Sequence, residues 1–453
     1  MRSESDTIAA IATATGQGAV ALVRVSGPDC RSVLANLTGK PLPEPRKATL
    51  RRLYNLDGEE VDQGIVTFYA GPASYTGEDC VEVSCHGGIA STRAVYQAVL
   101  QAGSRPAQPG EFTRRAFVNG KMDMAQAEAV NLLILARTRM QQQAAVQALE
   151  GAMARRISGA LASLTAAVTA LEASIDFPED VEDPDCLQLA GSLARVRDDI
   201  LDILRLAERG QMLQSGIRLA IVGRPNAGKS SILNLLAGRP RAIVSDIPGT
   251  TRDYLEETVE IGGLPVLAVD TAGIRKTDDP IEQEGARRAV EALDRADLAL
   301  VVIDSTKGAA PEDIEIAESA REKCVIVWNK TDLIPLEDID TLSFPGWNAK
   351  WQIRLSAATG QGLDGLLKAL SERLGTGAGF FEEAIAATSR QVGLLSEAGH
   401  LVAQALENLE QSAALDLTAV SVQAARARLG EITGENITES LIDSIFGNFC
   451  IGK

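Results

Sequence analysis

The sequence predicts an α/β nucleotide-binding domain inserted into a helical domain, with an α+β domain preceding both. Residues 1–120 mix short apolar segments with glycine-rich turns and helical pieces, as an α+β domain does. Residues 121–215 and 377–453 are rich in alanine and leucine at helical spacing. Residues 216–376 alternate strand-like with helix-like segments, which is typical of a doubly wound parallel sheet.

Length and composition agree with several intracellular domains. A chain of 453 residues is too long for one hydrophobic core and suits about three domains. Its six cysteines are scattered without a disulfide framework, which favours free thiols in a reducing compartment. No apolar run is long enough to cross a bilayer, and the acidic residues 1–6 do not resemble a signal peptide. We therefore expect a cytoplasmic protein without membrane attachment. Cys80, Cys85 and His86 fit no usual zinc spacing, so we assign them to a strand and its turn.

Residues 223–230, Gly-Arg-Pro-Asn-Ala-Gly-Lys-Ser, match a phosphate-binding loop between an apolar strand at 217–222 and an apolar helix. Gly223 and Gly228 permit a tight turn in which successive N–H groups point at phosphate oxygens. Lys229 is expected to reach the β- and γ-phosphates, and Ser230 to ligate Mg²⁺. The complete motif with both flanking elements argues against an ordinary glycine-rich turn.

Residues 329–332, Asn-Lys-Thr-Asp, follow an apolar strand and indicate which base is bound. The Asp332 carboxylate can accept two parallel hydrogen bonds, from N1–H and from the exocyclic amine of guanine. Adenine lacks both donors on that edge and would leave the acceptor unpaired, which opposes an ATP-dependent kinase. Ser356 and Ala357 follow another short strand and complete the pattern, so we predict guanine.

Residues 270–273, Asp-Thr-Ala-Gly, end a further strand and predict the part that senses the γ-phosphate. Asp270 is expected to hold Mg²⁺ through water, and the Gly273 N–H can contact the γ-phosphate. In Ras-like enzymes a glutamine follows this glycine and orients the attacking water. Ile274 occupies that position here and cannot orient water through its side chain, so hydrolysis requires another arrangement.

Asn226 and the loop at 245–253 offer the missing parts. The Asn226 amide, together with backbone carbonyls of that loop, is a reasonable cage for a weakly hydrated monovalent cation. Such an ion would place positive charge where an arginine finger supplies it in other enzymes. Asn226 could equally cap the turn, as asparagine often does. The spacing does not separate these two interpretations.

The sequence resembles the MnmE (TrmE) family of tRNA-modification GTPases over essentially its whole length. Residues 249–253, Gly-Thr-Thr-Arg-Asp, match the first switch of that family, and residues 449–453, Phe-Cys-Ile-Gly-Lys, match its terminal pentapeptide. Residues 109–117 and 121–129 are similar to its amino-terminal signature. The first-switch and terminal motifs are each fairly specific, and their occurrence in this order is more specific still.

The resemblance implies roles for residues of the nucleotide domain. Asn226, Ser245, Ile247 and Thr250 would coordinate potassium, and Ser230 and Thr251 would ligate Mg²⁺. Glu282 would orient the water network, although Glu284 lies close and both could be solvated helix charges, while Arg252 and Asp253 would order the switch. The motifs and the resemblance together predict nucleotide contacts by Asn226, Ala227, Gly228, Lys229, Ser230, Ser231, Ser245, Thr250, Thr251, Asp270, Thr271, Ala272, Gly273, Asn329, Lys330, Asp332, Ser356 and Ala357.

The resemblance also implies that residues 1–120 bind formyl-tetrahydrofolate and form a homodimer. Arg24, Glu82 and Lys121 match the folate contacts of the family, with Lys453 contributing. Without the resemblance these are ordinary charged residues. Cys450 could act as a nucleophile or acid in the modification chemistry, and a structural role is equally compatible with the sequence.

The net charge of −17 is unusual for a protein that acts on tRNA, since phosphate contacts need a basic surface. The basic pairs at 51–52 and 114–115 are only small patches, so we infer that a partner holds much of the tRNA. The family works with an FAD-dependent partner subunit, in a heterotetramer, which fits this deficit.

The sequence thus predicts a potassium-dependent GTPase that, with a flavoprotein partner, installs an aminomethyl-type group at C5 of wobble uridine in tRNA. The alternative is a GTPase switch in RNA or ribosome assembly, which usually carries a basic RNA-binding appendage. This chain has an acidic body instead.

Overall fold

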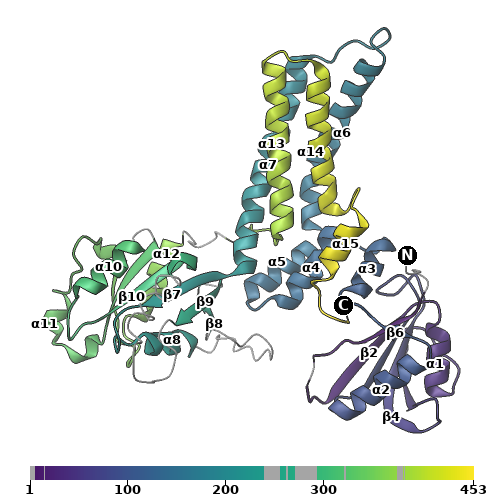
Figure 1. Ribbon diagram of the computed structural model, residues 1–453, viewed down its shortest axis with the longest axis horizontal. Helices are drawn as coiled ribbons and strands as arrows, with labels where there is room; N and C mark the ends of the chain where they lie inside the picture. Colours follow the sequence, from purple (N-terminus) through teal and green to yellow (C-terminus); the bar gives the residue numbers. More distant parts are fainter. Residues whose placement is uncertain are drawn as a thin grey trace. The chain divides into compact units, whose positions relative to one another are not determined.

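The computed structural model describes residues 6–14, 16–238, 256–261, 264–270, 293–320, 323–374, 381 and 383–452. Contacts divide the chain into two compact units. The first comprises residues 1–131, 149–200 and 394–453, and the second comprises residues 132–148 and 201–393. Each unit is built around its own six-stranded sheet (Figure 1).

The first sheet has the order β3-β4-β5-β2-β1-β6. All neighbouring pairs are antiparallel except β1 and β6. Helices α1 and α2 pack against one face, which makes this the α+β architecture that the sequence predicted (Figure 1). The elements are β1 (Ile8–Ile11), β2 (Val20–Ser26), α1 (Cys30–Thr38), β3 (Thr49–Tyr54), β4 (Glu60–Tyr69), β5 (Cys80–His86), α2 (Ile89–Gln101) and β6 (Arg105–Pro106).

Alternation along β2 and β5 divides this sheet into two chemically different faces. Val23 and Val83 are fully buried in the core shared with the helices. Arg24 and Glu82 therefore point to the opposite face, where the register pairs them directly. Cys80 and Cys85 lie in β5 as expected, and burial raises their thiol pKa values to about 12 and about 11. All six cysteines of the chain are free.

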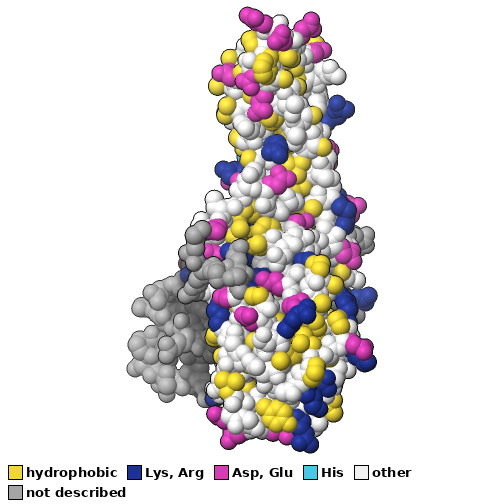
Figure 2. All heavy atoms as spheres, turned by 90° about the vertical axis from the view of Figure 1, so that its right-hand side faces the viewer, with side chains coloured by type: hydrophobic (Ala, Val, Ile, Leu, Met, Phe, Trp, Pro, Cys, Tyr) yellow, Lys and Arg dark blue, Asp and Glu magenta, His cyan; other side chains and the backbone are white. Residues whose placement is uncertain are grey.

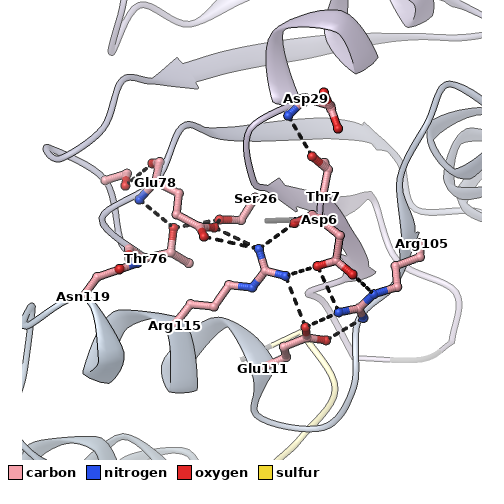
Figure 3. A network of polar contacts seen from close by, with 11 residues as sticks. Asp6, Thr7, Ser26, Asp29, Thr76, Glu78, Arg105, Glu111, Arg115 and Asn119 are labelled. Atoms are coloured by element: carbon pink, nitrogen blue, oxygen red, sulfur yellow. Dashed lines mark hydrogen bonds and ion pairs between the residues drawn. The ribbon is translucent and has the colours of Figure 1, made fainter. Parts of the chain in front are cut away.

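A network of ion pairs fastens β1 to helix α3 (Glu111–Val118), as Figure 3 shows. The Arg115 guanidinium is only 8% exposed and lies 2.7 Å from Asp6, 3.1 Å from Glu78 and 3.3 Å from Glu111. Arg105 reaches Asp6 and Glu111 as well, at 2.6 Å each. Because both guanidinium groups lie between carboxylates, each buried charge has partners of opposite sign.

This network predicts that the first unit loses stability in acid. Burial alone would raise the pKa values of Asp6 and Glu111, but hydrogen bonds from the arginines hold both below their ordinary values of 3.8 and 4.5. A carboxyl group with a lowered folded-state pKa stabilises the fold above its unfolded pKa and loses this contribution as the pH falls. The urea midpoint of the first unit should therefore stay level near neutrality and fall below about pH 4.5. In the Asp6→Asn variant this fall should be shallower.

Helices α6 and α14 of the first unit lie side by side in an elongated bundle (Figure 1). Helices α6 and α14 contact each other along their length, and Arg426 on α14 donates to Thr165 on α6 at 3.0 Å. The acidic segment at 177–185 separates α6 from α7 as a loop. The helices between α3 and residue 216, and those after residue 374, are α4 (Met124–Leu135), α5 (Arg139–Leu149), α6 (Ala152–Asp176), α7 (Cys186–Ser215), α13 (Ser389–Glu410), α14 (Leu415–Thr433) and α15 (Glu439–Phe446).

Helix α6 corrects one expectation from the sequence. With 25 residues and a mean hydropathy of 1.3 in its most apolar window, it is long and apolar enough to cross a membrane. The alanine-rich composition hid this, because its apolar character is spread along the helix without a run of large side chains. One such helix is weak evidence for a membrane span, since core helices pass the same test. In this structure, α6 packs against α14.

The second sheet has the order β12-β11-β10-β7-β9-β8, parallel throughout except for β8. Helix α10 contacts β10, whereas α8 contacts β7 and β9, and α12 contacts β11 and β12. This is the predicted α/β arrangement with buried parallel strands. The elements are β7 (Ile217–Val222), α8 (Lys229–Ala237), β8 (Glu256–Ile261), β9 (Leu264–Asp270), β10 (Leu298–Asp304), α10 (Pro311–Ser319), β11 (Cys324–Asn329), η2 (Thr331–Leu333), α11 (Leu336–Ile339), η3 (Ala349–Trp351), β12 (Gln352–Arg354) and α12 (Leu363–Arg373).

The sequence predicted helical spacing over residues 377–453, but α13 begins only at Ser389. The preceding segment packs its backbone against α7 instead. Ile385 donates its N–H to the Leu206 carbonyl at 3.1 Å, and a Cβ on Gly210 would stand 1.7 Å from the Ile385 carbonyl oxygen. The apolar residues that suggested a helix here are buried in this close approach.

Candidate nucleotide-binding site

The phosphate loop joins the end of β7 to the start of α8, and two of its glycines are required by close contacts. Gly223 has a φ of 141°, and a Cβ there would lie 2.3 Å from the Val302 carbonyl oxygen. Gly228 has a φ of 98°, and a Cβ there would lie 2.1 Å from the Asn329 side-chain nitrogen. Both positions exclude any larger residue, because strain and collision add to each other.

Lys229 and Asn226 have distinct places in this loop. The Lys229 side chain is buried, and its ammonium donates to the carbonyls of Gly223 at 2.7 Å and Arg224 at 3.0 Å. Asn226 is exposed and has a φ of 62°, a left-handed conformation that asparagine tolerates better than most residues. Among the residues that the structure describes, no hydrogen bond from the Asn226 side chain is seen, although its backbone carbonyl is engaged.

Asn329 joins the phosphate loop to the last of the predicted motifs. Its side-chain nitrogen donates to the Ala227 carbonyl at 2.8 Å, and its side-chain oxygen accepts from the Ala357 N–H at 3.0 Å. Asn329 is 2% exposed and Ser356 is fully buried, so this junction is solvent-free. The three motifs meet because the carboxyl ends of neighbouring parallel strands lie at one edge of the sheet.

Lys330 and Asp332 follow Asn329 at this edge. The Lys330 ammonium donates to the Asp304 carboxylate at 2.7 Å and to the Asn226 carbonyl at 2.8 Å. Burial alone would raise the pKa of Asp304, but hydrogen bonds from Lys330 and Thr306 lower it, which keeps the carboxylate charged. Asp332 lies in the short helix η2 with an exposed side chain.

Sequence reasoning missed Asp304, although a signal was present. Asp304 ends the buried strand β10, between the strands that carry the loop and the base-binding motif. A carboxylate at the carboxyl end of a central parallel strand is expected to face the site. Here it anchors Lys330 and does not present itself to a ligand directly.

Several predicted contacts lie outside the described residues, so the structure does not place them. They are Ser245, Ile247, Thr250, Thr251, Arg252, Asp253, Thr271, Ala272, Gly273, Glu282, Lys453 and the side chain of Asp270. Among the described members of the set, Ser230 and Ser231 open α8 directly after the loop.

Arg24 and Glu82 form a second, separate cluster on the open face of the first sheet. Glu82 accepts two hydrogen bonds from Arg24, at 2.8 Å and 3.1 Å, and a third from the Tyr69 hydroxyl at 3.4 Å. The Arg24 guanidinium also lies over the rings of Tyr75 and Phe112, with 5.2 Å and 5.8 Å to the centroids. Sequence reasoning gave neither aromatic residue a role, although Phe112 lies within the amino-terminal signature at 109–117.

The carboxyl-terminal segment reaches this cluster. The Gly452 carbonyl accepts from Arg24 at 3.5 Å, and a Cβ on Gly452 would stand 2.8 Å from the Ile11 carbonyl oxygen. Cys450 is exposed and is held through its backbone, since its carbonyl accepts from Gly110 at 3.4 Å. Lys121 does not join Arg24 or Glu82 in the described part of the chain, and its ammonium donates to the Pro72 carbonyl at 2.9 Å.

The glycine-rich loop follows a parallel strand, and Asn329 of the base-binding motif connects it to Ala357, which follows the next strand. This arrangement defines a P-loop protein of the GTPase class. Two family models match the chain: "GTP-binding protein TrmE N-terminus" over residues 7–121 and "MnmE helical domain" over residues 124–450. The chain therefore belongs to the MnmE (TrmE) family of tRNA modification GTPases.

Relatives named tRNA modification GTPase MnmE agree over nearly the full length. The protein of Moorella thermoacetica is 42% identical over 463 residues, covering 99% of both chains. That of Halorhodospira halophila is 42% identical, covering 99% of this chain and 96% of its own. That of Bacillus thuringiensis is 39% identical, covering 99% of this chain and 100% of its own.

Proposed function

We propose that this chain is a potassium-dependent GTPase of the cytoplasm that acts, with an FAD-dependent partner subunit, on tRNA. Together they would install an aminomethyl-type group at C5 of the wobble uridine. The single observation that supports this best is the full-length match to relatives whose name joins GTP hydrolysis to tRNA modification. The same match favours this function over a switch in ribosome assembly.

The loop geometry supports binding of GTP with Mg²⁺. The backbone N–H groups between Gly223 and Lys229 can cradle phosphate oxygens, and the helix α8 begins at the same point with its positive end. Ser230 would ligate Mg²⁺ with Thr251, and Asp270 would act through water. Asp332 would read the guanine edge from the exposed side of η2. Glu282 would orient the attacking water, and Arg252 and Asp253 would order the switch.

A potassium ion beside the phosphate loop would supply the positive charge that an arginine finger supplies elsewhere. The Asn226 amide is suited to this because it is exposed and makes no hydrogen bond to a described residue, as capping the turn would require. The left-handed backbone of residue 226 is a separate reason for an asparagine at this position. Ser245, Ile247 and Thr250 would complete the cage.

Hydrolysis in potassium and in sodium buffer tests this proposal with the variant Asn226→Gly. Glycine keeps the left-handed backbone of residue 226, with a φ of 62°, and removes only the amide. We expect wild-type turnover in potassium to exceed that in sodium by on the order of tenfold or more, and Asn226→Gly to show the sodium rate in both. Asn436→Gly is the matched control, since Asn436 has a φ of 57°.

Equal wild-type rates in the two salts would remove the cation from the mechanism. A normal potassium response in Asn226→Gly would keep the cation but place it on other ligands. Alanine is a poorer choice than glycine at residue 226, because a Cβ without a polar group strains a left-handed backbone by about 1 kcal/mol.

The first unit would bind formyl-tetrahydrofolate through Arg24, Glu82, Lys121 and Lys453, and would form the homodimer. The partly buried Arg24 guanidinium between Tyr75 and Phe112 suits a ligand with an anionic tail and a flat ring. A folate bound there would supply the one-carbon unit. The exposed Cys450 is near enough in sequence to Gly452 for its thiol to serve the same centre.

The proposed domains are residues 1–120, residues 121–215 with 377–453, and residues 216–376. The second family model supports an inserted nucleotide domain, because its match runs from residue 124 to residue 450 and so encloses β7 to α12. In this arrangement the helical domain receives both ends of the nucleotide domain, so a change on hydrolysis has two connections through which to act.

The charge distribution supports a partner that holds the tRNA. Residues 157–194 and 394–425, which form the distal parts of α6, α7, α13 and α14, contain no Lys or Arg. Acidic side chains gather toward the upper end in Figure 2. Phosphates would be repelled there. The acidic residues of these two segments are Glu172, Asp176, Glu179, Asp180, Glu182, Asp183, Asp185, Glu397, Glu407, Glu410 and Asp416.

A further inference from the structure

The side chain of Arg224, in the phosphate loop, makes two strong contacts with the segment that begins α10. Its Nε atom lies 2.9 Å from the Asp313 carboxylate, and one terminal nitrogen donates to the Gly308 carbonyl at 2.7 Å. Meanwhile the backbone carbonyl of Arg224 accepts from the Lys229 ammonium at 3.0 Å. Arg224 therefore connects Lys229 of the phosphate loop to the segment that begins helix α10.

Asp313, which accepts the contact from Arg224, is held in place by the fold. Its side chain is fully buried, and the same oxygen that meets Arg224 accepts the Ala310 N–H at 2.9 Å, capping α10. Its other carboxylate oxygen has no partner among the described residues. A buried carboxylate is costly unless a cation neutralises it, so Arg224 cannot leave this position without exposing or stranding Asp313.

We propose that Arg224 is a positioning residue for GTP hydrolysis, acting through its ion pair with Asp313. The pair fixes the first half of the phosphate loop to α10, and thereby fixes the two carbonyls that hold the Lys229 ammonium. This inference rests on the proposed GTPase activity. Neither residue belongs to the phosphate-binding, base-binding or cation-binding sets described above.

The physical argument is one of rigidity. The loop between Gly223 and Gly228 contains two glycines and one left-handed asparagine, so its backbone is held by contacts more than by local preference. Asn329 anchors the second half through the Ala227 carbonyl. Arg224 anchors the first half by an ion pair with Asp313 and a hydrogen bond to the Gly308 carbonyl, and these two contacts together fix the orientation of the guanidinium. Displacing catalytic groups by about 1 Å is enough to lower a rate about a hundredfold.

The test separates positioning from stability with four variants. Arg224→Met removes the cation and strands Asp313, so both the melting temperature and GTP turnover should fall. Arg224→Met/Asp313→Leu removes both charges together, which should restore most of the melting temperature. Arg224→Lys keeps the charge. Arg218→Met is the matched control, because Arg218 is exposed on β7 and only its backbone makes a described contact.

If Arg224 positions the loop, Arg224→Met and the double variant should each show a KM for GTP and a Kd for GDP raised on the order of tenfold or more, while Arg224→Lys recovers part of the loss and Arg218→Met keeps the wild-type constants. Both constants are measured well below the melting temperature of each variant, where nearly all of the protein is folded, because partial unfolding would by itself raise them. The ratio of the KM values for GTP and inosine triphosphate should stay at its wild-type value, because Asp332 reads the base.

Unchanged KM and Kd in Arg224→Met would overturn the proposal, and so would a double variant that regains normal constants together with its melting temperature. Either result would make the pair a purely stabilising contact. A wild-type protein that binds GDP but fails to hydrolyse GTP in any salt would instead count against the proposed function.

Discussion

Asp332→Asn should exchange the base that this protein binds, from guanine to xanthine. The asparagine oxygen can still accept from N1–H, but its NH₂ group meets the exocyclic amine of guanine as donor against donor. Losing one charge-assisted hydrogen bond and the charge on the other should weaken GTP binding about a hundredfold or more. Xanthine carries a carbonyl in place of that amine, so the new NH₂ donor finds an acceptor.

The measurement is a titration of the variant with fluorescent GDP and xanthosine diphosphate. Asp338→Asn is the matched control, since Asp338 is exposed in the neighbouring helix α11. It should bind GDP normally and reject the xanthine nucleotide. If Asp332→Asn binds GDP as tightly as the wild type, another group reads the base. The expected change resides in the side chain alone, because η2 places Asp332 at the surface and no described residue depends on its carboxylate.

The order of motifs along the chain was sufficient to predict which of them meet. Gly223, Asn329 and Ser356 each follow a parallel strand, and the carboxyl ends of these strands form one edge of the sheet. Their convergence therefore follows from topology. What the sequence could not supply was the direction of the Asn329 side chain, which turns away from solvent to join Ala227 and Ala357.

The Arg224–Asp313 pair could not be predicted for a different reason. Asp313 follows Pro311 and Glu312 at the start of a helix, where acidic residues usually cap the helix in solvent. Nothing local distinguishes it from its neighbour Glu312, which is exposed, whereas Asp313 is fully buried. Only tertiary packing separates the two, and a local pattern carries no information about packing.

The sequence misplaced the start of a helix where buried apolar residues have helical spacing without forming a helix. The segment before Ser389 has the apolar spacing of a helix, yet it forms no helix in its described residues, and the Ile385 N–H donates to the Leu206 carbonyl of α7. Helix α6 was misjudged for a similar reason. Its many alanines leave no run of large apolar side chains in the sequence, although the mean hydropathy of its most apolar window reaches 1.3.

Arg115→Met should destabilise the first unit by about 3 kcal/mol, because it leaves the partly buried Glu78 carboxylate without its ion pair. Arg105 remains to pair with Asp6 and Glu111, but Glu78 loses its ion pair and keeps only neutral partners. The matched control is Arg52→Met, which removes an exposed ion pair with Glu60 at 3.3 Å and should cost less than about 1 kcal/mol. Urea denaturation followed by circular dichroism measures both.

The segments that lose protection from hydrogen exchange in Arg115→Met distinguish loss of this network from a general destabilisation of the unit. Helix α3 carries Arg115, and Gly110 just before it holds the Cys450 carbonyl, so the change should reach the carboxyl-terminal segment. Hydrogen exchange in Arg115→Met should therefore rise in β1, α3 and residues 446–452, while α6 stays protected. Adding Glu78→Gln should restore part of the stability, since it removes the stranded charge. If Arg115→Met is tolerated as well as Arg52→Met, water reaches these carboxylates and the network does not anchor the terminus.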